Sequence, residues 1–252
     1  MEIKRCELLN CSIDAITIDR LLQDFNKGVL VTPNVDHMMT LQEDYEFYKI
    51  YQEADYIVLD SQVIAFIMKY FLRTPVPEKI SGSDFFPAFC QYHKDNPDIK
   101  IFLLGGKAGA PEKAMELINK KVGSNIVIGA HSPSMGFENN ADECASIVEM
   151  INSSGATVLA IGVGSPKQEK WIFNFKKMLP RVRIFMGIGA TIEFEAGYVD
   201  RAPYWISRIG FEWLYRLLQE PRRLWRRYLI RDIPFFWLVL KQRIGLYKNP
   251  FC

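Results

Sequence analysis

Residues 157–189 read TVLAIGVGSPKQEKWIFNFKKMLPRVRIFMGIG, and this stretch decides the predicted fold. Its first part, Thr157–Val163, is a largely apolar run that predicts a buried strand, and a helical pattern then extends to about Met178. A second run, Val182–Met186, predicts another strand, which ends in Gly187-Ile188-Gly189. A strand, a helix and a strand in this order form a βαβ unit, so the two strands should be parallel.

The same alternation extends towards the N-terminus. Further strands are predicted at Gly28–Val31, Tyr56–Leu59, Lys100–Leu104 and Ile126–Ile128. Helices are predicted between the strands at residues 36–54, 62–72, 83–94 and 141–153, and from Pro111 onward. Three of the strands are short apolar runs, as expected for strands covered on both faces. The predicted fold class is therefore α/β, with a Rossmann-like parallel sheet and flanking helices as the core over residues 1–199.

The alternation stops near residue 200, where the composition of the chain changes. Residues 200–252 carry 11 Lys and Arg against four Asp and Glu, a net charge of +7, whereas residues 1–199 carry −5. The same segment holds 12 of the 33 aromatic residues. Helices are predicted at about 203–219 and 222–246, which makes this part a basic, amphipathic helical appendage. Such a segment favours a polyanionic partner, either nucleic acid or an anionic membrane surface.

Composition excludes several classes of protein. The 252 residues are 49% hydrophobic and 24% charged, which is ordinary for a folded chain and rules out disorder. Five cysteines without a CxxC spacing and three scattered histidines argue against zinc sites and disulfide frameworks. No cofactor is expected. The N-terminal MEIKRCELLNC predicts no signal peptide. The longest apolar run of the appendage, Ile233–Leu240, is far shorter than the roughly 20 residues that span a bilayer.

Ligands of parallel α/β sheets bind beyond the carboxyl ends of the strands. The polar and glycine residues predicted at that edge are Thr32, Asn34, Asp60, Gly105, Gly106, Gly164, Ser165, Gly187 and Gly189. Two of the glycine turns precede helices, whose free N–H groups favour the phosphates of a nucleotide, although either turn alone could serve without a ligand. Neither turn has the GxGxxG or the P-loop pattern, so nicotinamide binding and ATP hydrolysis are not indicated.

Asp60 is the candidate general base. It ends an apolar strand and precedes Ser61, so its carboxylate can either take a proton from a substrate or cap the helix that starts at residue 62. Asp36 and His37 lie near the same edge and are weaker candidates for the base.

Two further patterns have local explanations. Ser165-Pro166-Lys167-Gln168 predicts a helix start in which Ser165 is the N-cap and Gln168 completes a capping box. The chain lacks the Asp-x-Asp with which many nucleotide-sugar transferases hold a metal, and Glu193-x-Glu195 is the nearest substitute. In an alternating strand this pattern only directs both carboxylates to one face, so no metal site is predicted there.

The strongest compositional signal is a group of arginines in the appendage. Its members are Arg216, Arg222, Arg223, Arg226, Arg227 and Arg231. Aromatic residues interleave with them, which is typical of an interfacial helix whose arginines reach lipid headgroups. Nucleic-acid binding and a solvated helix face are the alternative interpretations.

Taken in chain order, these motifs resemble the WecG/TagA/CpsF family of glycosyltransferases. The residues that carry the resemblance are Thr32-Pro33-Asn34, Ala54–Asp60, Pro77–Asp84, Leu104-Gly105-Gly106, Gly162–Glu169, Gly187–Ala190, Val199–Pro203 and Phe211–Leu217. They span nearly the whole chain, and the last two segments are the most diagnostic.

The resemblance implies inverting, metal-independent transfer of a hexose or N-acetylhexosamine from a UDP-sugar to a polyprenyl-diphosphate-linked sugar. The expected setting is the cytoplasmic face of the cell membrane, where the protein would be peripheral and make a cell-surface polysaccharide or teichoic acid. The resemblance assigns the base to Asp60 and the substrate pocket to Thr32, Asn34 and Gln168. It also favours oligomers of the core.

The chain departs from the family pattern at three positions. Ser61 follows Asp60 where the family usually has glycine, Lys79 stands in place of arginine, and Glu193 stands in place of aspartate. We expect Lys79 and Glu193 still to bind substrate, although a lysine lacks the bidentate fork of an arginine.

Charge on the departing diphosphate has to be offset by cationic side chains and helix N-termini, because no metal is expected. Arg216, Arg222 and Arg223 are predicted to supply that charge, with the glycine turns binding the nucleotide. The alternative interpretation, from a different class, is a non-catalytic protein that binds a nucleotide-sugar or a nucleic acid, supported by the altered positions and the basic appendage.

Overall fold

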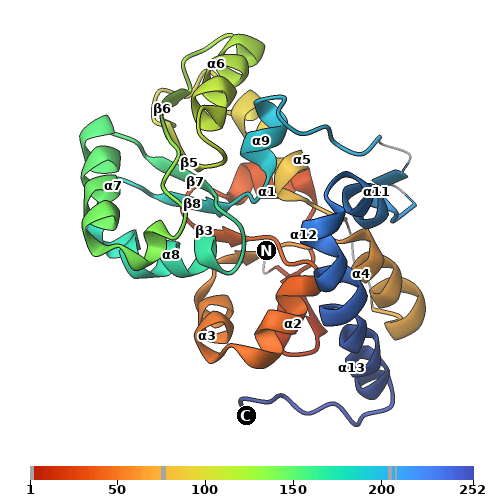
Figure 1. The fold of residues 1–252 in the computed structure, drawn as a ribbon. Helices are drawn as coiled ribbons and strands as arrows, with labels where there is room; N and C mark the ends of the chain where they lie inside the picture. The colour runs from red at the N-terminus through yellow and green to blue at the C-terminus, as the bar shows by residue number, and fades with distance from the viewer. Residues whose placement is uncertain (1–2, 75–77, 204–205, 208) are drawn as a thin grey trace.

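The computed structural model describes residues 3–74, 78–203, 206–207 and 209–252. Its centre is a six-stranded parallel sheet in the order β4-β3-β8-β7-β5-β6 (Figure 1). The strands are β3 Gly28–Val31, β4 Tyr56–Ile57, β5 Ile101–Gly105, β6 Val127–His131, β7 Val158–Gly162 and β8 Ile184–Gly187. The predicted α/β class with a Rossmann-like parallel sheet is therefore confirmed.

Successive strand residues face opposite sides of the sheet and enter two separate apolar clusters. On β7, for example, Leu159 and Ile161 belong to one cluster and Val158 and Ala160 to the other. Both faces of the sheet are thus dry, which explains why the strands are continuous apolar runs.

Each face of the sheet is covered by its own layer of helices (Figure 1). One layer holds α2 Val35–Glu43, α3 Tyr45–Glu53, α4 Gln62–Phe66 with a π-helical turn Ile67–Leu72, α7 Ala141–Ser154 and α8 Lys167–Phe175. The other holds α1 Ile18–Asp24, α5 Gly82–Tyr92, α6 Ala110–Val122 and α9 Thr191–Glu195. This two-sided covering leaves the carboxyl edge of the sheet available for a site.

The first part of the chain differs from the prediction in two ways. The helix predicted over 36–54 is divided at Asp44, whose extended backbone ends α2 and whose side chain caps α3 by accepting the Phe47 N–H at 3.0 Å. An antiparallel hairpin, β1 Arg5–Leu8 and β2 Cys11–Asp14, precedes the sheet and was not predicted. Asp14 fastens it to the edge strand by accepting the Ile57 N–H at 2.8 Å.

The C-terminal segment forms α11 Glu212–Gln219, α12 Pro221–Arg226, a π-helical turn Arg227–Arg231 and α13 Ile233–Arg243. Residues 204–205 and 208 of the helix predicted over 203–219 lie outside the described residues. Phe235 and Val239 of α13 are buried in the same apolar cluster as the strands. Beyond α13, the Tyr247 hydroxyl donates to Gln42 Oε1 at 2.8 Å, so this segment packs on the layer that contains α2. Within the described residues, no helix is long and apolar enough to span a bilayer.

Candidate active site

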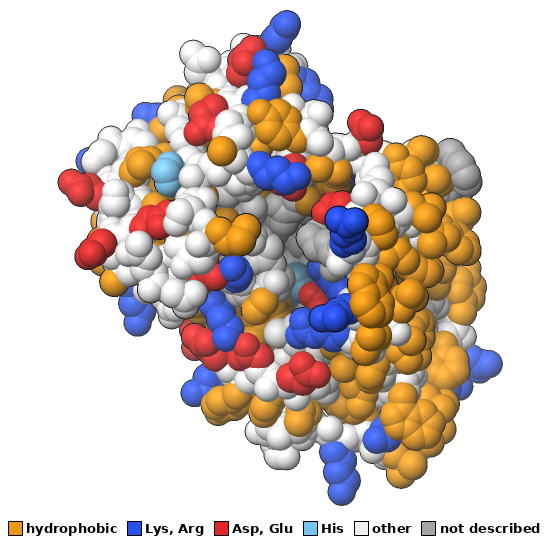
Figure 2. Space-filling model, in the orientation of Figure 1, with side chains coloured by type: hydrophobic (Ala, Val, Ile, Leu, Met, Phe, Trp, Pro, Cys, Tyr) orange, Lys and Arg blue, Asp and Glu red, His pale blue; other side chains and the backbone are white. Residues whose placement is uncertain are grey.

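A cavity of about 870 Å³, here called the larger cavity, opens at the carboxyl edge of the sheet. Figure 2 shows it as the hollow near the middle of the face. The predicted site residues that line it are Thr32, Asn34, Asp60, Gly106, Gly164, Ser165, Gln168, Gly189, Glu193 and Arg216. The fold therefore brings together residues from strand ends, turns and helices that are up to 184 positions apart in the chain.

Asp60 lies in this cavity just beyond β4. Its N–H donates to the carbonyl oxygen of Pro33 at 3.1 Å, which holds the backbone next to the end of β3. Ser61 caps α4, because its hydroxyl accepts the N–H of Ile64 at 3.3 Å. The interpretation of Asp60 as the helix cap is therefore wrong, and its carboxylate remains available for chemistry.

Burial raises the pKa of Asp60 to about 7. Lys79 and Arg216 oppose this shift by favouring the carboxylate, while Glu212 reinforces it by repulsion. A carboxyl group whose pKa lies near neutrality is suited to general-base catalysis, since a substantial fraction is ionised near pH 7 and the carboxylate is still basic enough to take a proton.

Lys79 affects this site from behind the cavity wall. Its Nζ lies 3.6 Å from Asp84 Oδ2 and 3.9 Å from Glu212 Oε2, and it does not line the larger cavity. Arg201 also binds Asp84, with its Nη2 2.6 Å from Oδ1. Lys79 therefore lowers the pKa of Asp60 and connects α5 to α11.

The glycine turns meet where the strands end. Gly105 has φ +126°, and a Cβ there would stand 2.5 Å from the carbonyl oxygen of Gly162, so only glycine lets the two strand ends approach this closely. Gly105 therefore lies behind the wall, whereas Gly106, Gly164 and Gly189 line the larger cavity. Gly164 and Gly189 also have positive φ and nothing within 4 Å of an added Cβ, so their backbone is open to a ligand.

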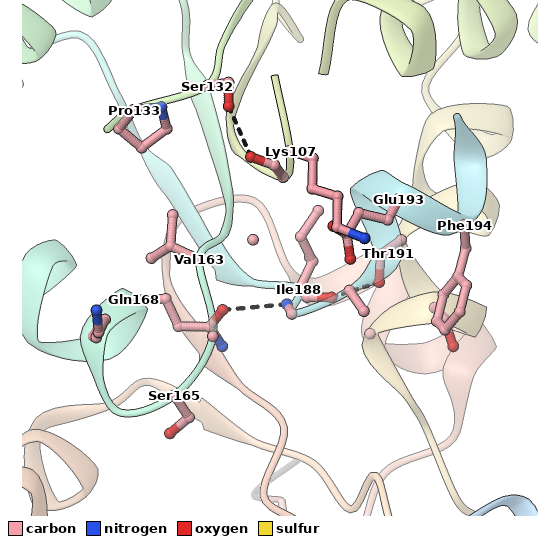
Figure 3. A pocket seen from close by; sticks show the side chains of 18 of the residues that line it. Lys107, Ser132, Pro133, Val163, Ser165, Gln168, Ile188, Thr191, Glu193 and Phe194 are labelled. Carbon is pink, nitrogen blue, oxygen red and sulfur yellow. Dashed lines mark hydrogen bonds between the residues drawn. The ribbon is translucent and has the colours of Figure 1, made fainter. Parts of the chain in front are cut away.

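Gln168 joins two of these turns. It is buried, its Nε2 donates to Glu169 Oε1 at 2.7 Å, and its Oε1 accepts the N–H of Gly189 at 3.2 Å (Figure 3). The amide is thus oriented from both ends and holds the turn after β8 against α8. The predicted capping box is wrong, because α8 begins at Lys167 and no side chain caps its first turn.

Glu193 lines the larger cavity. It lies in α9, so the strand assumed for Glu193-x-Glu195 is wrong. Residues two apart on a helix point in different directions, and Glu195 Oε2 instead lies 3.7 Å from Lys121 Nζ. Lys107, from the turn after β5, extends towards Glu193 (Figure 3). Among the described residues, no three His, Cys, Asp or Glu side chains are grouped so that they could hold a metal ion.

A second, smaller cavity of about 350 Å³ adjoins the larger one. The two share Asn34, Asp60, Glu212, Arg216 and Arg227. The outer walls of the smaller cavity come from α4 and from the C-terminal helices, and they include the apolar side chains of Val63, Trp213, Leu229, Ile233 and Phe236. Asp60 therefore stands where the larger cavity meets a smaller one with a more apolar lining.

The three arginines predicted to bind the diphosphate differ in whether they line the cavities. Arg216 on α11 lines both cavities, whereas Arg222 on α12 is exposed and lines neither. The side chain of Arg223 lies outside the described part of the structure.

Arg227 is a site residue that the sequence analysis did not select. Its Nη2 lies 3.3 Å from Asp36 Oδ2 and 3.3 Å from Asn34 Oδ1, and it lines both cavities beside Asp60. Its sequence signal was the same as that of Arg222, because both belong to one arginine group. The contacts of each side chain distinguish them: Asn34 and Asp36 hold Arg227 at the site, whereas Arg222 is exposed to solvent.

Asp36 and His37 do not have the properties of a base. Asp36 is buried and is shared by Arg227 and Arg231, with Arg231 Nη1 3.2 Å from its Oδ1. His37 Nδ1 is 2.9 Å from the Tyr51 hydroxyl, and burial together with the two arginines lowers the pKa of His37 to about 3. His37 therefore remains neutral at working pH, which leaves Asp60 as the base candidate of this group.

A parallel α/β sheet whose glycine turns and near-neutral carboxylate meet at two joined cavities is suited to an enzyme that transfers a group between two substrates. The chain belongs to the WecG/TagA/CpsF family of glycosyl transferases, whose family model matches residues 6–249. It is accordingly a glycosyltransferase, of a family that acts in the synthesis of cell-surface polymers.

Proposed function

We propose that the protein transfers a sugar from a UDP-sugar to a sugar carried on polyprenyl diphosphate, with inversion and without a metal. The observation that carries this proposal is the position of Asp60 at the junction of the two cavities, with a pKa of about 7. Family membership supplies the reaction class, and the joined cavities support two substrates that meet at one carboxylate.

The donor binds in the larger cavity. Its volume of about 870 Å³ lies in the range of sites for small organic ligands. The backbone at Gly106, Gly164 and Gly189 faces the space in which a diphosphate would lie, and Lys107 and Arg216 add positive charge. Glu193, which also lines the larger cavity, supplies a carboxylate that binds sugar hydroxyls.

The acceptor enters through the smaller cavity. Its apolar walls suit the hydrocarbon next to a lipid diphosphate, while Arg216 and Arg227 stand at its inner end to bind the phosphates. The first sugar of the acceptor then lies beside Asp60.

The reaction is a single displacement. Asp60 takes the proton of an acceptor hydroxyl as the hydroxyl oxygen attacks the anomeric carbon of the donor. The bond from that carbon to the UDP oxygen breaks on the opposite face, which inverts the configuration. The cations and backbone N–H groups around the larger cavity stabilise the negative charge that develops on UDP.

The protein acts at the cytoplasmic face of the cell membrane as a peripheral protein. Support comes from exposed apolar side chains next to basic residues on the C-terminal helices: Trp225, Ile230, Ile233, Phe236 and Trp237 are between 42% and 58% exposed. Arg222 and Arg226 lie on the same helices and are exposed. This combination is typical of interfacial helices.

The test is a donor screen with the purified protein, a panel of UDP-sugars and a lipid-diphosphate sugar, in the presence of EDTA. We expect one donor to release UDP and to give a product whose new linkage has the opposite anomeric configuration by NMR. Absence of UDP release with every donor would refute the proposal. A product with retained configuration would refute the single displacement, and loss of turnover in EDTA would refute metal independence.

A further inference from the structure

The helix formed by α4 and its π-helical turn, residues 62–72, is apolar on two opposite faces. Ile64 and Met68 are fully buried against the core. Phe66, Tyr70 and Phe71 point outward and are 38%, 68% and 42% exposed. A helix on the surface of a water-soluble domain normally has a polar outer face. Packing within the chain therefore explains the inner face of this helix but not the outer one.

The outer face of this helix adjoins the apolar surface of the C-terminal segment. A Cβ added at Gly210 would stand 3.3 Å from the Phe66 ring, so the chain just before α11 lies against α4. Ile209 and Phe211, on either side of that glycine, are 50% and 48% exposed. Figure 1 places α4 between α11 and α13, and Figure 2 shows hydrophobic side chains in a continuous area along that side. A continuous apolar area of this kind is unusual on a protein that has no partner there.

The end of the same helix is basic. Lys69 and Arg73 are exposed, and Lys69 Nζ lies 5.2 Å from the centre of the Tyr70 ring. Exposed aromatic rings beside long basic side chains match the boundary between acyl chains and anionic headgroups, because the rings enter the apolar layer while the cations reach the phosphates.

We infer that residues 66–73 of the core, with Phe66, Tyr70 and Phe71 as the apolar contacts and Lys69 and Arg73 as the charged ones, dock on an anionic lipid bilayer beside the C-terminal helices. This inference rests on the proposed membrane location and extends it from the appendage to the core. The smaller cavity lies between the two contact regions, since Val63 of α4 and Phe236 of α13 both line it. Its mouth then faces the bilayer, and a lipid-linked substrate reaches Asp60 without crossing water.

The experiment measures binding of the full chain to sedimented vesicles of equimolar phosphatidylglycerol and phosphatidylcholine. We expect the double variant Tyr70→Ser/Phe71→Ser to bind with a partition coefficient at least about tenfold lower, because two partly exposed aromatic rings no longer enter the lipid. Tyr92→Ser is the matched control: Tyr92 is 54% exposed on α5, on the other side of the sheet, and its loss should leave binding unchanged. Lys69→Gln and Arg73→Gln should each weaken binding about fivefold, and only on anionic vesicles.

Melting temperature and turnover of a soluble short-chain acceptor should be unchanged in the double variant, because neither side chain lines a cavity. If the double variant unfolds, Tyr70→Ser alone repeats the test at the most exposed of the three aromatic positions. Unchanged vesicle binding by a folded variant overturns the inference and leaves the proposed function intact. A wild-type chain that binds no vesicles overturns the membrane location and this inference together. A dimer in sedimentation velocity that the variant loses, with vesicle binding unchanged, would assign the surface to a second copy of the chain instead.

Discussion

Replacing Asp60 by asparagine tests the base directly, because the substitution keeps the shape of the side chain and removes its ability to take a proton. General-base catalysis is worth about 10²–10⁴-fold in rate. We expect kcat to fall within that range, while the affinity for UDP changes little, because Asp60 lies at the junction of the cavities and not at the glycine turns.

The raised pKa of Asp60 fixes how the wild-type rate depends on pH. With a pKa of about 7, the carboxylate fraction is about 10% at pH 6, half at pH 7 and about 90% at pH 8. The base is the ionised form, so kcat/KM should rise with pH over this range and fall about fivefold from pH 7 to pH 6. The asparagine variant should lack this acidic limb.

The raised pKa of Asp60 also affects stability: the rate should rise with pH, whereas the contribution of Asp60 to stability should fall. The folded state keeps the Asp60 proton up to a pH of about 7, whereas the unfolded chain loses it near its ordinary pKa of 3.8. The unfolded state therefore binds fewer protons between these values, and the contribution of Asp60 to stability falls as pH rises. Asp60 is partly open to the cavity, and solvent there screens its charge. The free-energy effect of its pKa shift is therefore about 1–2 kcal/mol, less than the full shift would give. Asp60→Asn should increase the free energy of unfolding by that amount at pH 8 and by little at pH 4.

The assays are UDP release across a pH series, calorimetric titration of UDP, and urea unfolding at both pH values. Turnover near the wild-type rate in Asp60→Asn would refute the assignment of the base. Glu193, one of several other carboxylates that line the larger cavity, would then be examined first, since Asp36 is ion-paired and His37 is neutral. An acidic limb that persists in the variant would show that another group controls the pH dependence.

Four further outcomes are expected. Arg227→Gln should raise the acceptor KM about tenfold or more with little change in the donor KM, since a charge-assisted contact is worth about 1.5–3 kcal/mol. Arg231→Gln is the control, because Arg231 also pairs with Asp36 but does not line the larger cavity. Gln168→Ala should weaken UDP affinity about tenfold, because the turn at Gly189 loses its hydrogen bond, and calorimetry that shows unchanged affinity would contradict this role. Phe235→Ala should lower the free energy of unfolding by about 3–5 kcal/mol in urea, whereas Phe236→Ala, at a 52% exposed position, should change it by less than about 0.5 kcal/mol. Deleting residues from Ala202 onward removes no strand, so we expect a folded core with a lower melting temperature and weaker vesicle binding. Turnover of a soluble acceptor should also fall, because Arg216 and Arg227 are lost. An insoluble core would show that the C-terminal helices are an integral layer of the fold.

The family match also bears on the alternative of a non-catalytic binding protein. Membership of a glycosyltransferase family identifies the chain as a glycosyltransferase. The particular donor, the acceptor and the membrane face remain the predictions that the donor screen and the vesicle assays test.

Much of the sheet and part of the site could be predicted from local sequence. Apolar runs such as Thr157–Val163, which contains β7 Val158–Gly162, identified buried strands, because a strand covered on both faces has no polar side to interrupt the pattern. Asp60 could be placed at the ligand edge because parallel strands all end on the same side. The hairpin at residues 5–14 was missed, since its strands mix charged and apolar residues in place of a continuous apolar run, and since Asp14 binds the backbone of the distant strand β4.

The sequence by itself thus determined the α/β class, the edge at which ligands bind and the carboxylate that follows β4, because these follow from periodicity along the chain. The tertiary structure alone decided the strand order, the second cavity and the choice of Arg227 over Arg222. Strand order depends on which helices pack on which face, and no local pattern carries that information. The direction of an arginine depends on the turns before it and on distant partners. Arg227 lines both cavities because Asn34 and Asp36, nearly 200 positions earlier in the chain, hold its guanidinium there.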